Sequence, residues 1–201
     1  MIRTILKLSV CVIITSILAS CGSDRSSESN VLPLQGTQFN PLSGNLSITD
    51  GIISGTGKMV ANLPLDSVQS AHHFEIAFRI PNGGALKLLT HATDTLESGN
   101  AIRFVRQRNI VIIEVDSLPV GQFETSAETD TLRATIDVHN DESEGAHILV
   151  WAGGASTAGT ENPLCEPHRQ NGLLGAGSYW GLELDQATVS LAKFGDAIDQ
   201  D

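Results

Sequence analysis

The stretch HFEIAFRI, residues 73–80, decides the fold. Its apolar side chains fall on every second position, and its polar side chains fall mostly on the positions between them. Successive side chains of a β-strand point to opposite faces, so this period of two predicts a strand with one face in a core and the other toward solvent. The residues PNGG, 81–84, follow directly and supply turn chemistry. ALKLLTHA, residues 85–92, is therefore expected to return as the antiparallel partner of a hairpin.

Similar short apolar or alternating stretches continue on both sides of this hairpin. We expect further strands at residues 44–49, 51–61, 100–107, 109–115, 132–138, 147–152, 179–184 and 187–194. Many glycines separate these stretches, and nothing after Cys21 has the apolar period of an amphipathic helix. About ten short strands at such spacing predict an all-β fold, either an antiparallel two-sheet β-sandwich or a barrel.

Two parts of the chain resemble known jelly-roll domains. The succession from FEIAFRI through NIVIIEV, residues 74–115, resembles the central hairpins of concanavalin A-like and laminin-G jelly rolls. YWGLELDQATVSLAKFGDA, residues 179–197, is similar to their final strand pair. This resemblance covers about residues 44–195 and implies a concanavalin A-like β-sandwich. An immunoglobulin-like sandwich and a lipocalin-like barrel would show the same alternation and stay open as alternatives.

The first twenty residues have the parts of a secretory signal peptide. Met1 to Lys7 is basic, and residues 8–18 are mostly apolar but too few to cross a bilayer as a helix. Small residues then precede Cys21, and this order is typical of a segment that is removed after export.

Leu18-Ala19-Ser20-Cys21 resembles the lipobox of bacterial lipoproteins. The resemblance implies that the Cys21 thiol receives diacylglycerol and that the chain is cut just before it. Two or three acyl chains hold a protein durably at a membrane. Gly22 stands where that family uses Asp for retention in the inner membrane of enteric bacteria, so we expect the outer membrane of a bacterial cell envelope. A plain signal peptide that happens to precede Cys21 is the alternative.

These features divide the chain into three segments. We expect a signal peptide over residues 1–20, a flexible tether over 21–36 and one β-sandwich domain over 37–201. The residues from Gly22 to about Asn30 are small and polar, so they cannot bury enough apolar surface to become ordered. The remaining segment of about 165 residues is long enough for one domain with a genuine core.

The net charge limits the classes of partner that the protein can bind, and the cysteine count limits its disulfides. The chain has 12 basic and 23 acidic residues, a net charge of −11. Without Arg3 and Lys7 the balance is 10 against 23, or −13. Such a surface repels phosphate groups, so we expect no nucleic-acid partner and a membrane contact through the acyl chains alone. Once Cys11 is removed and Cys21 modified, only Cys165 remains, so the domain has no internal disulfide. Cys165 lacks a catalytic motif and is expected to be inert.

One stretch bears on catalysis. The retaining β-glucanases of the jelly-roll class carry a strand motif E-x-D-x-x-E or E-x-D-x-E, in which one carboxylate attacks the sugar and another donates a proton. Glu114-Val115-Asp116 matches the first half of this motif, but no second glutamate follows and Pro119 favours the end of the strand. We therefore interpret the pair as a solvated face.

A second stretch bears on metal binding. HNDESEGAH, residues 139–147, gathers oxygen ligands beside the preceding strand. Asp137, Asp141 and Glu142 are the candidate ligands for a hard cation such as Ca²⁺, which is the single cofactor that we consider. The segment lacks the D-x-D-x-D-G order of known calcium loops, and a solvated hairpin loop explains it as well.

Sugar-binding surfaces commonly present an exposed aromatic ring, which makes Trp151, Tyr179 and Trp180 the candidate platforms. Trp180 shares its strand face with Leu182 and Leu184, which favours burial. Trp151 lies where a strand meets the Gly153-Gly154 loop and is expected to be more exposed. The stretch of residues 153–177 is the longest irregular one, and long loops on a sandwich are common binding surfaces. His72, on the apolar face, is expected in the core.

The residues therefore predict a lipid-anchored envelope protein whose β-sandwich is a non-catalytic binding or structural module for a glycan or another envelope protein. A jelly-roll glycan hydrolase and a carrier of an apolar ligand are the alternatives. The sequence does not favour a specific activity beyond these classes.

Overall fold

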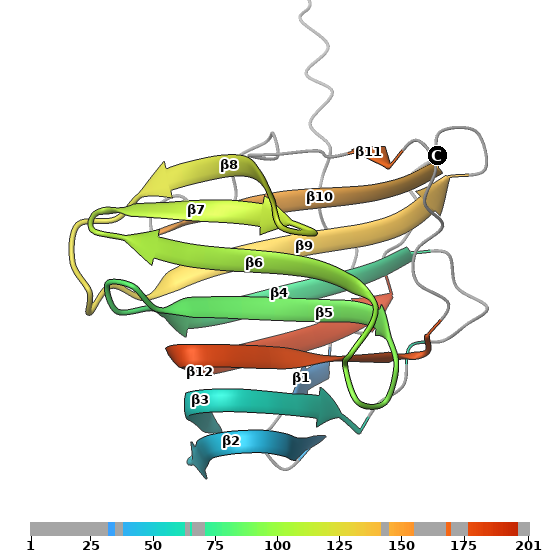
Figure 1. Cartoon of the computed structure of the whole chain (residues 1–201), viewed down its shortest axis with the longest axis horizontal. Coiled ribbons are helices and arrows are strands. Elements are labelled where there is room, and N and C mark those ends of the chain that lie inside the picture. The colour runs from blue at the N-terminus through green and yellow to red at the C-terminus, as the bar shows by residue number, and fades with distance from the viewer. Residues whose placement is uncertain are drawn as a thin grey trace, which may run out of the picture.

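The computed structural model describes residues 32–34, 38–62, 65, 71–141, 145–154, 168–169 and 177–196 (Figure 1). These residues form twelve strands, and all of their pairings are antiparallel. The strands are β1 (Leu32–Leu34), β2 (Phe39–Thr49), β3 (Ile52–Ala61), β4 (Ala71–Arg79), β5 (Ala85–Ala92), β6 (Asn100–Gln107), β7 (Ile110–Val115), β8 (Leu118–Glu124), β9 (Leu132–Asp141), β10 (Gly145–Gly154), β11 (His168–Arg169) and β12 (Tyr179–Asp196).

The strands form two layers that share β12 (Figure 1). The front sheet has the order β8-β7-β6-β5-β12-β3-β2, and the back sheet has the order β11-β10-β9-β4-β12-β1. The first part of β12 pairs with β5 and β3, and its last part pairs with β4 and β1. The register against β3 shifts between Leu184 and Ala187, where the strand passes from one layer to the other. Hydrogen bonding is therefore continuous through both sheets.

The space between the sheets is filled by the apolar side chains of the alternating strands. Trp180 lies at the centre of an aromatic cluster, and its ring centroid is 5.5 Å from Phe39, 5.3 Å from Phe74 and 5.3 Å from Phe194. Each large side chain that is fully buried in this way contributes about 1.5–3 kcal/mol. The predicted all-β, two-sheet antiparallel sandwich is confirmed, and its described core is packed where a carrier would need a hollow interior.

Most predicted strands agree with the observed ones, and β5 and β6 have the predicted bounds. Two differences have a physical cause. The two strands expected over residues 179–194 are one strand, because a bulge carries the chain through the Asp185-Gln186 pair without a turn. The strand β8 follows β7 despite Pro119, because β8 ends the strand order of its sheet and an edge strand tolerates a missing N–H group.

The N-terminal predictions fall largely outside the described residues. The signal peptide of residues 1–20 and the lipid site Cys21 lie there, so they stay predictions. Residues 32–34 of the expected tether pair with β12 as β1, so ordered pairing begins before the domain boundary expected at residue 37. In the part of the chain that the structure describes, no helix has the length and apolar character needed to traverse a bilayer.

Candidate ligand-binding groove

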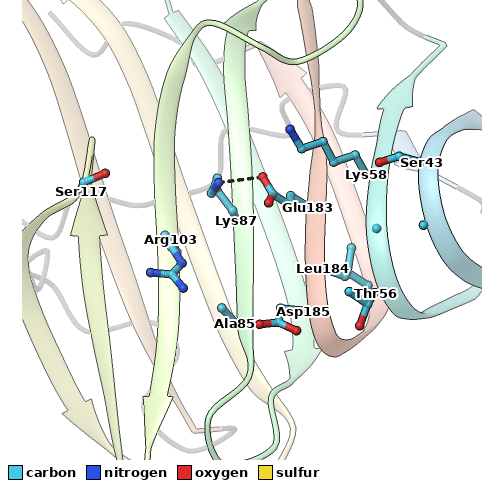
Figure 2. A pocket seen from close by; sticks show the side chains of 12 residues that line it. Ser43, Thr56, Lys58, Ala85, Lys87, Arg103, Ser117, Glu183, Leu184 and Asp185 are labelled. Atoms are coloured by element: carbon cyan, nitrogen blue, oxygen red, sulfur yellow. Dashed lines mark hydrogen bonds and ion pairs between the residues drawn. The ribbon is translucent and has the colours of Figure 1, made fainter.

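A groove of about 600 Å³ lies on the solvent face of the front sheet (Figure 2). It crosses β2, β3, β12, β5 and β6 and reaches the turn between β7 and β8. The residues that line it are Ser43, Gly44, Thr56, Gly57, Lys58, Ala85, Lys87, Arg103, Ser117, Glu183, Leu184 and Asp185.

A row of charged side chains runs along the groove and onto β7. The strand register places one charged residue from each of five neighbouring strands side by side. In spatial order this charged row is Lys58, Glu183, Lys87, Arg103 and Glu114. Neighbouring strands lie about 4.8 Å apart, so the row extends over roughly 19 Å. The neighbours of these residues along each strand point the other way, mostly into the core, and this alternation turns the charged residues toward solvent.

Ion pairs fix most of the charged row. The Lys87 Nζ atom lies 2.7 Å from Glu183 Oε2, and Arg103 Nη1 lies 3.0 Å from Glu114 Oε2. All four side chains are partly exposed, so each pair stabilises the fold by at most about 1 kcal/mol. Their main effect is to hold four charged groups in fixed positions. Lys58 has no ion-pair partner among the described residues.

Backbone forms one wall of the groove. Gly44 of β2 lies opposite Gly57 of β3, and a Cβ atom on Gly57 would lie 2.2 Å from the Ser43 carbonyl oxygen. Gly44 has a φ of 85°, which is in the left-handed region. Glycine at both positions lets the two backbones approach closely and keeps side chains out of this wall.

Apolar side chains border the other side of the charged row. Val60 and Leu89 lie two residues from Lys58 and Lys87, and so on the same face of the sheet. They pack with Ala92 and with Leu96 from the β5–β6 connection in a small cluster separate from the main core. The groove is therefore bounded by backbone at one end and by an apolar cluster along its side.

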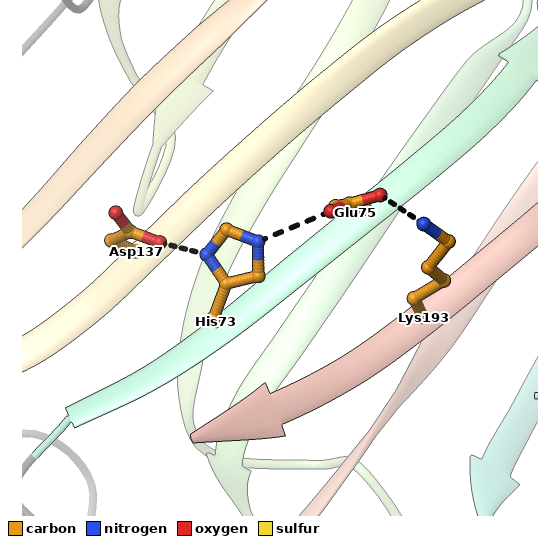
Figure 3. A network of polar contacts seen from close by, with 4 residues as sticks. All are labelled: His73, Glu75, Asp137 and Lys193. Carbon is orange, nitrogen blue, oxygen red and sulfur yellow. Dashed lines mark hydrogen bonds and ion pairs between the residues drawn. The ribbon is translucent and has the colours of Figure 1, made fainter. Parts of the chain in front are cut away.

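The back sheet carries a second polar network on its solvent face (Figure 3). His73 Nδ1 lies 2.5 Å from Asp137 Oδ1, and His73 Nε2 lies 3.5 Å from Glu75 Oε1. Lys193 Nζ lies 2.7 Å from Glu75 Oε2. Burial alone would lower the pKa of His73, but the hydrogen bond and charge of Asp137, with the charge of Glu75, raise it. The network ties β9, β4 and β12 together, which is a structural role.

The predicted metal site at Asp137, Asp141 and Glu142 lies partly outside the described residues and stays a prediction. Asp137 is hydrogen-bonded to His73, Asp141 ends β9, and Glu142 lies outside the described residues. No group of three histidine, cysteine or carboxylate side chains within the described ranges is arranged to hold a metal ion.

The aromatic candidates do not form a platform in the groove. Trp180 is 1% exposed, as its shared face with Leu182 and Leu184 predicted, so it cannot stack on a sugar. The exposure expected for Trp151 is wrong, because the side chain is only 8% exposed. The strand continues to Gly154 and pairs Trp151 with Thr135, so the residue lies within β10 and not in a loop. Tyr179 is 40% exposed but does not line the groove.

The remaining residues singled out in the sequence are Glu114, Asp116, His72 and Cys165. Glu114 belongs to the charged row, whereas Asp116 lies in the β7–β8 turn and accepts a hydrogen bond from the Ala101 N–H at 3.0 Å. The two side chains therefore have different partners, Arg103 for Glu114 and the Ala101 N–H for Asp116. His72 is buried, as expected. Cys165 and most of residues 153–177 lie outside the described residues, although His168–Arg169 pair with β10 as β11.

Sequence reasoning missed Lys58, Lys87, Arg103 and Glu183 as site residues. Each is a single charged residue flanked by residues that point to the opposite face, as in Leu182-Glu183-Leu184. This repeated pattern was the available signal, since a charge at an outward position of several strands marks a common charged face.

No family model matches the chain, and no curated protein matches it in sequence. Solved structures do match it in fold. The potassium-bound carbohydrate recognition domain of Emp46p has a TM-score of 0.52 at 10% identity, covering 81% of this chain and 90% of that one. The legume lectin-like domain from Entamoeba histolytica has a TM-score of 0.51 at 10% identity, with coverages of 83% and 97%. The CBM2 module of the evolved Dit of Lactobacillus casei BL23 phage J-1 has a TM-score of 0.50 at 9% identity, with coverages of 79% and 82%.

At such low identity these likenesses establish the fold alone. The predicted concanavalin A-like jelly roll agrees with them, since a legume lectin-like domain is among the matches. The chain therefore has an antiparallel jelly-roll β-sandwich fold, similar to the folds of these domains.

Proposed function

We propose that this protein is a non-catalytic glycan-binding module that is held at the bacterial cell envelope by lipid on Cys21. The observation that carries the glycan proposal is the charged row in the groove of the front sheet. Two solved structures of similar fold are a carbohydrate recognition domain and a legume lectin-like domain, which supports the same function.

The charged row suits a ligand that is rich in hydroxyl groups. Lys87 and Arg103 have several N–H donors each, and one ion pair uses only part of them. Glu183 likewise keeps a second carboxylate oxygen that can accept a hydrogen bond. Hydrogen bonds to charged groups are roughly twice as strong as those between neutral groups. Because the ion pairs already hold these side chains, a sugar that binds them orders little that is mobile.

The groove contains two carboxylates, Glu183 and Asp185, so glycan hydrolysis needs a separate argument. A glycosidase requires a protonated carboxylic acid, which enzymes usually create by placing the group in apolar surroundings. Asp185 is exposed, and Glu183 is partly exposed and paired with Lys87. Neither environment suits a general acid, which favours binding without turnover.

Binding of the purified full chain to an array of envelope and plant glycans, followed by titration calorimetry, tests this proposal. We expect binding that is lost in the Lys87→Gln/Arg103→Gln double variant. Arg133 is exposed on the back sheet, so Arg133→Gln removes a positive charge away from the groove and is the matched control. An array without a glycan ligand would contradict the proposal, and turnover of a bound polysaccharide would contradict its non-catalytic part.

The lipid anchor has its own test. Expression in a bacterial host with labelled palmitate should label the wild-type protein and the Cys165→Ala variant but not Cys21→Ala. Globomycin, which inhibits the lipoprotein signal peptidase, should block processing, and membrane fractionation should find the labelled protein in the outer membrane. A mature protein that starts upstream of Cys21 would contradict the anchor without affecting the groove.

A further inference from the structure

We propose that the groove selects glycans that carry an anionic group, and that Lys58 binds this group. The inference rests on the proposed glycan-binding function and specifies its ligand class. Uronate carboxylates and sulfate esters share the required chemistry, since both offer a negative charge with several acceptor oxygens.

The first argument is the balance of charge in the row. Its three cations face two carboxylates, and the ion pairs join Lys87 to Glu183 and Arg103 to Glu114. The row therefore has an excess of one positive charge, although the chain as a whole carries −11. Lys58 is the residue in excess, because the described residues offer it no carboxylate within ion-pair distance.

The register explains why Lys58 is left over. Glu183 lies opposite both Lys58 and Lys87, and its carboxylate pairs with Lys87 at 2.7 Å. On its other side Lys58 lies opposite Ser43 of β2, which offers a hydroxyl group and no charge. The next position on β2 is Gly44, which has no side chain.

Asp185, the other carboxylate that lines the groove, lies away from this position. Figure 2 shows the Lys58 amine on the Glu183 side of the groove and Asp185 near Thr56 and Leu184 at its other end. An anionic group that enters on the Glu183 side of the groove therefore meets the Lys58 ammonium group, which has no carboxylate within ion-pair distance among the described residues.

This arrangement predicts that the groove binds an acidic glycan more tightly than its neutral counterpart. Lys58 would form a charge-assisted hydrogen bond with an anionic substituent, whereas a neutral hydroxyl offers a weaker partner. A hydrogen bond to a charged group contributes enough to change affinity by roughly 10- to 100-fold. None of the described residues that line the groove is aromatic, so polar contacts carry the discrimination. The preference should weaken as salt screens the partly exposed charges.

A matched pair of ligands tests the inference. Oligogalacturonate and its carboxyl-reduced form share stereochemistry and linkage, and they differ in charge at C6. Calorimetric titration of the full chain at low and high salt should give a roughly 10- to 100-fold preference for the acidic form at low salt. Lys58→Gln should reduce this ratio to near one, Lys58→Arg should keep most of it, and Arg133→Gln should leave it unchanged. A sulfated galactan in place of the uronate, with the same dependence on Lys58, would also support the inference.

Two results would overturn it. The first is equal affinity for the acidic and reduced oligosaccharides while either of them binds in the groove. The second is an acidic preference that persists in Lys58→Gln. Both leave the glycan-binding proposal intact, which fails separately if the glycan array gives no ligand at all.

Discussion

Replacement of Gly44 by alanine tests the close approach of backbones that forms the groove wall. Gly44 and Gly83 are both exposed and have almost the same backbone angle, with φ of 85° and 82°. They differ in the space for a side chain. A Cβ atom on Gly44 would lie 2.3 Å from the Thr56 carbonyl oxygen and 2.5 Å from the Gly57 Cα atom. A Cβ atom on Gly83 would meet nothing within 4 Å. Gly83→Ala is therefore a control for backbone strain alone.

The expected magnitudes follow from these contacts. A left-handed conformation costs alanine about 1–2 kcal/mol, and the lower entropy of its unfolded chain offsets about 0.4–1 kcal/mol of this. Gly83→Ala should therefore lose about 0–1.5 kcal/mol. Gly44→Ala has the same costs of backbone strain and the same gain from unfolded-state entropy. It must also move β2 away from β3, which adds about 1–3 kcal/mol to the loss of stability. For a chain of this size each kcal/mol lowers Tm by about 2–4 °C.

Urea unfolding of both variants measures the difference, and amide exchange across the β2–β3 pair shows whether the loss is local to that edge. We also expect Gly44→Ala to weaken glycan binding, because Gly44 lines the groove. Equal midpoints together with equal amide exchange in the two variants would refute the steric argument.

Four further changes test the core, the polar networks and the buried histidines. Arg106 is 2% exposed and donates hydrogen bonds to the carbonyl oxygens of Arg108, Ile80 and Ala127. Arg106→Lys should lose about 2–4 kcal/mol in urea unfolding because an ammonium group cannot reproduce the planar fork, and a loss below about 0.5 kcal/mol would contradict this role. Trp180→Ala should lose about 3–5 kcal/mol in the same assay, and a much smaller loss would show that the aromatic cluster is loosely packed. The third and fourth changes concern the pH dependence of stability. Because the pKa of His73 is raised, its stabilising effect is fully present below about pH 6.5 and is lost as pH rises through the folded-state value. In thermal unfolding, the difference in Tm between wild type and His73→Gln should therefore become smaller as the pH rises. A difference that stays constant with pH would contradict the raised pKa. His91 behaves oppositely, since burial and the nearby His72 lower its pKa to about 4. The folded protein should lose stability as pH falls from about 6.5 toward 4, and His91→Asn should reduce that loss.

Local pattern was sufficient to predict most of the strands. In β6 the residues Ile102 and Phe104 enter the core while Arg103 faces solvent, so the alternation itself marks the element. Alternation failed where the chain changes layers within one strand. Asp185 and Gln186 look like a turn in the sequence, but β12 passes through them as a bulge.

The groove could not be predicted because it depends on register between distant strands. Lys87 and Glu183 are 96 residues apart in the chain, yet they form an ion pair across neighbouring strands. Nothing local to either residue specifies that pairing. The search for exposed aromatic rings also pointed elsewhere, since Trp180 fills the core and Trp151 is buried within β10.

The position of β12 has a consequence for the order of assembly. This strand has a neighbouring strand on each side in both sheets, but it follows every strand that it joins along the chain. During synthesis β3, β4 and β5 are therefore made before β12, the strand with which all three pair. Neither sheet can complete its hydrogen bonding until residues 179–196 have been synthesised. Such distant pairing makes folding slower than in proteins whose contacts are mostly local. The chain consequently gains its final shape in one late event, after a period in which unpaired strand edges need protection from other chains.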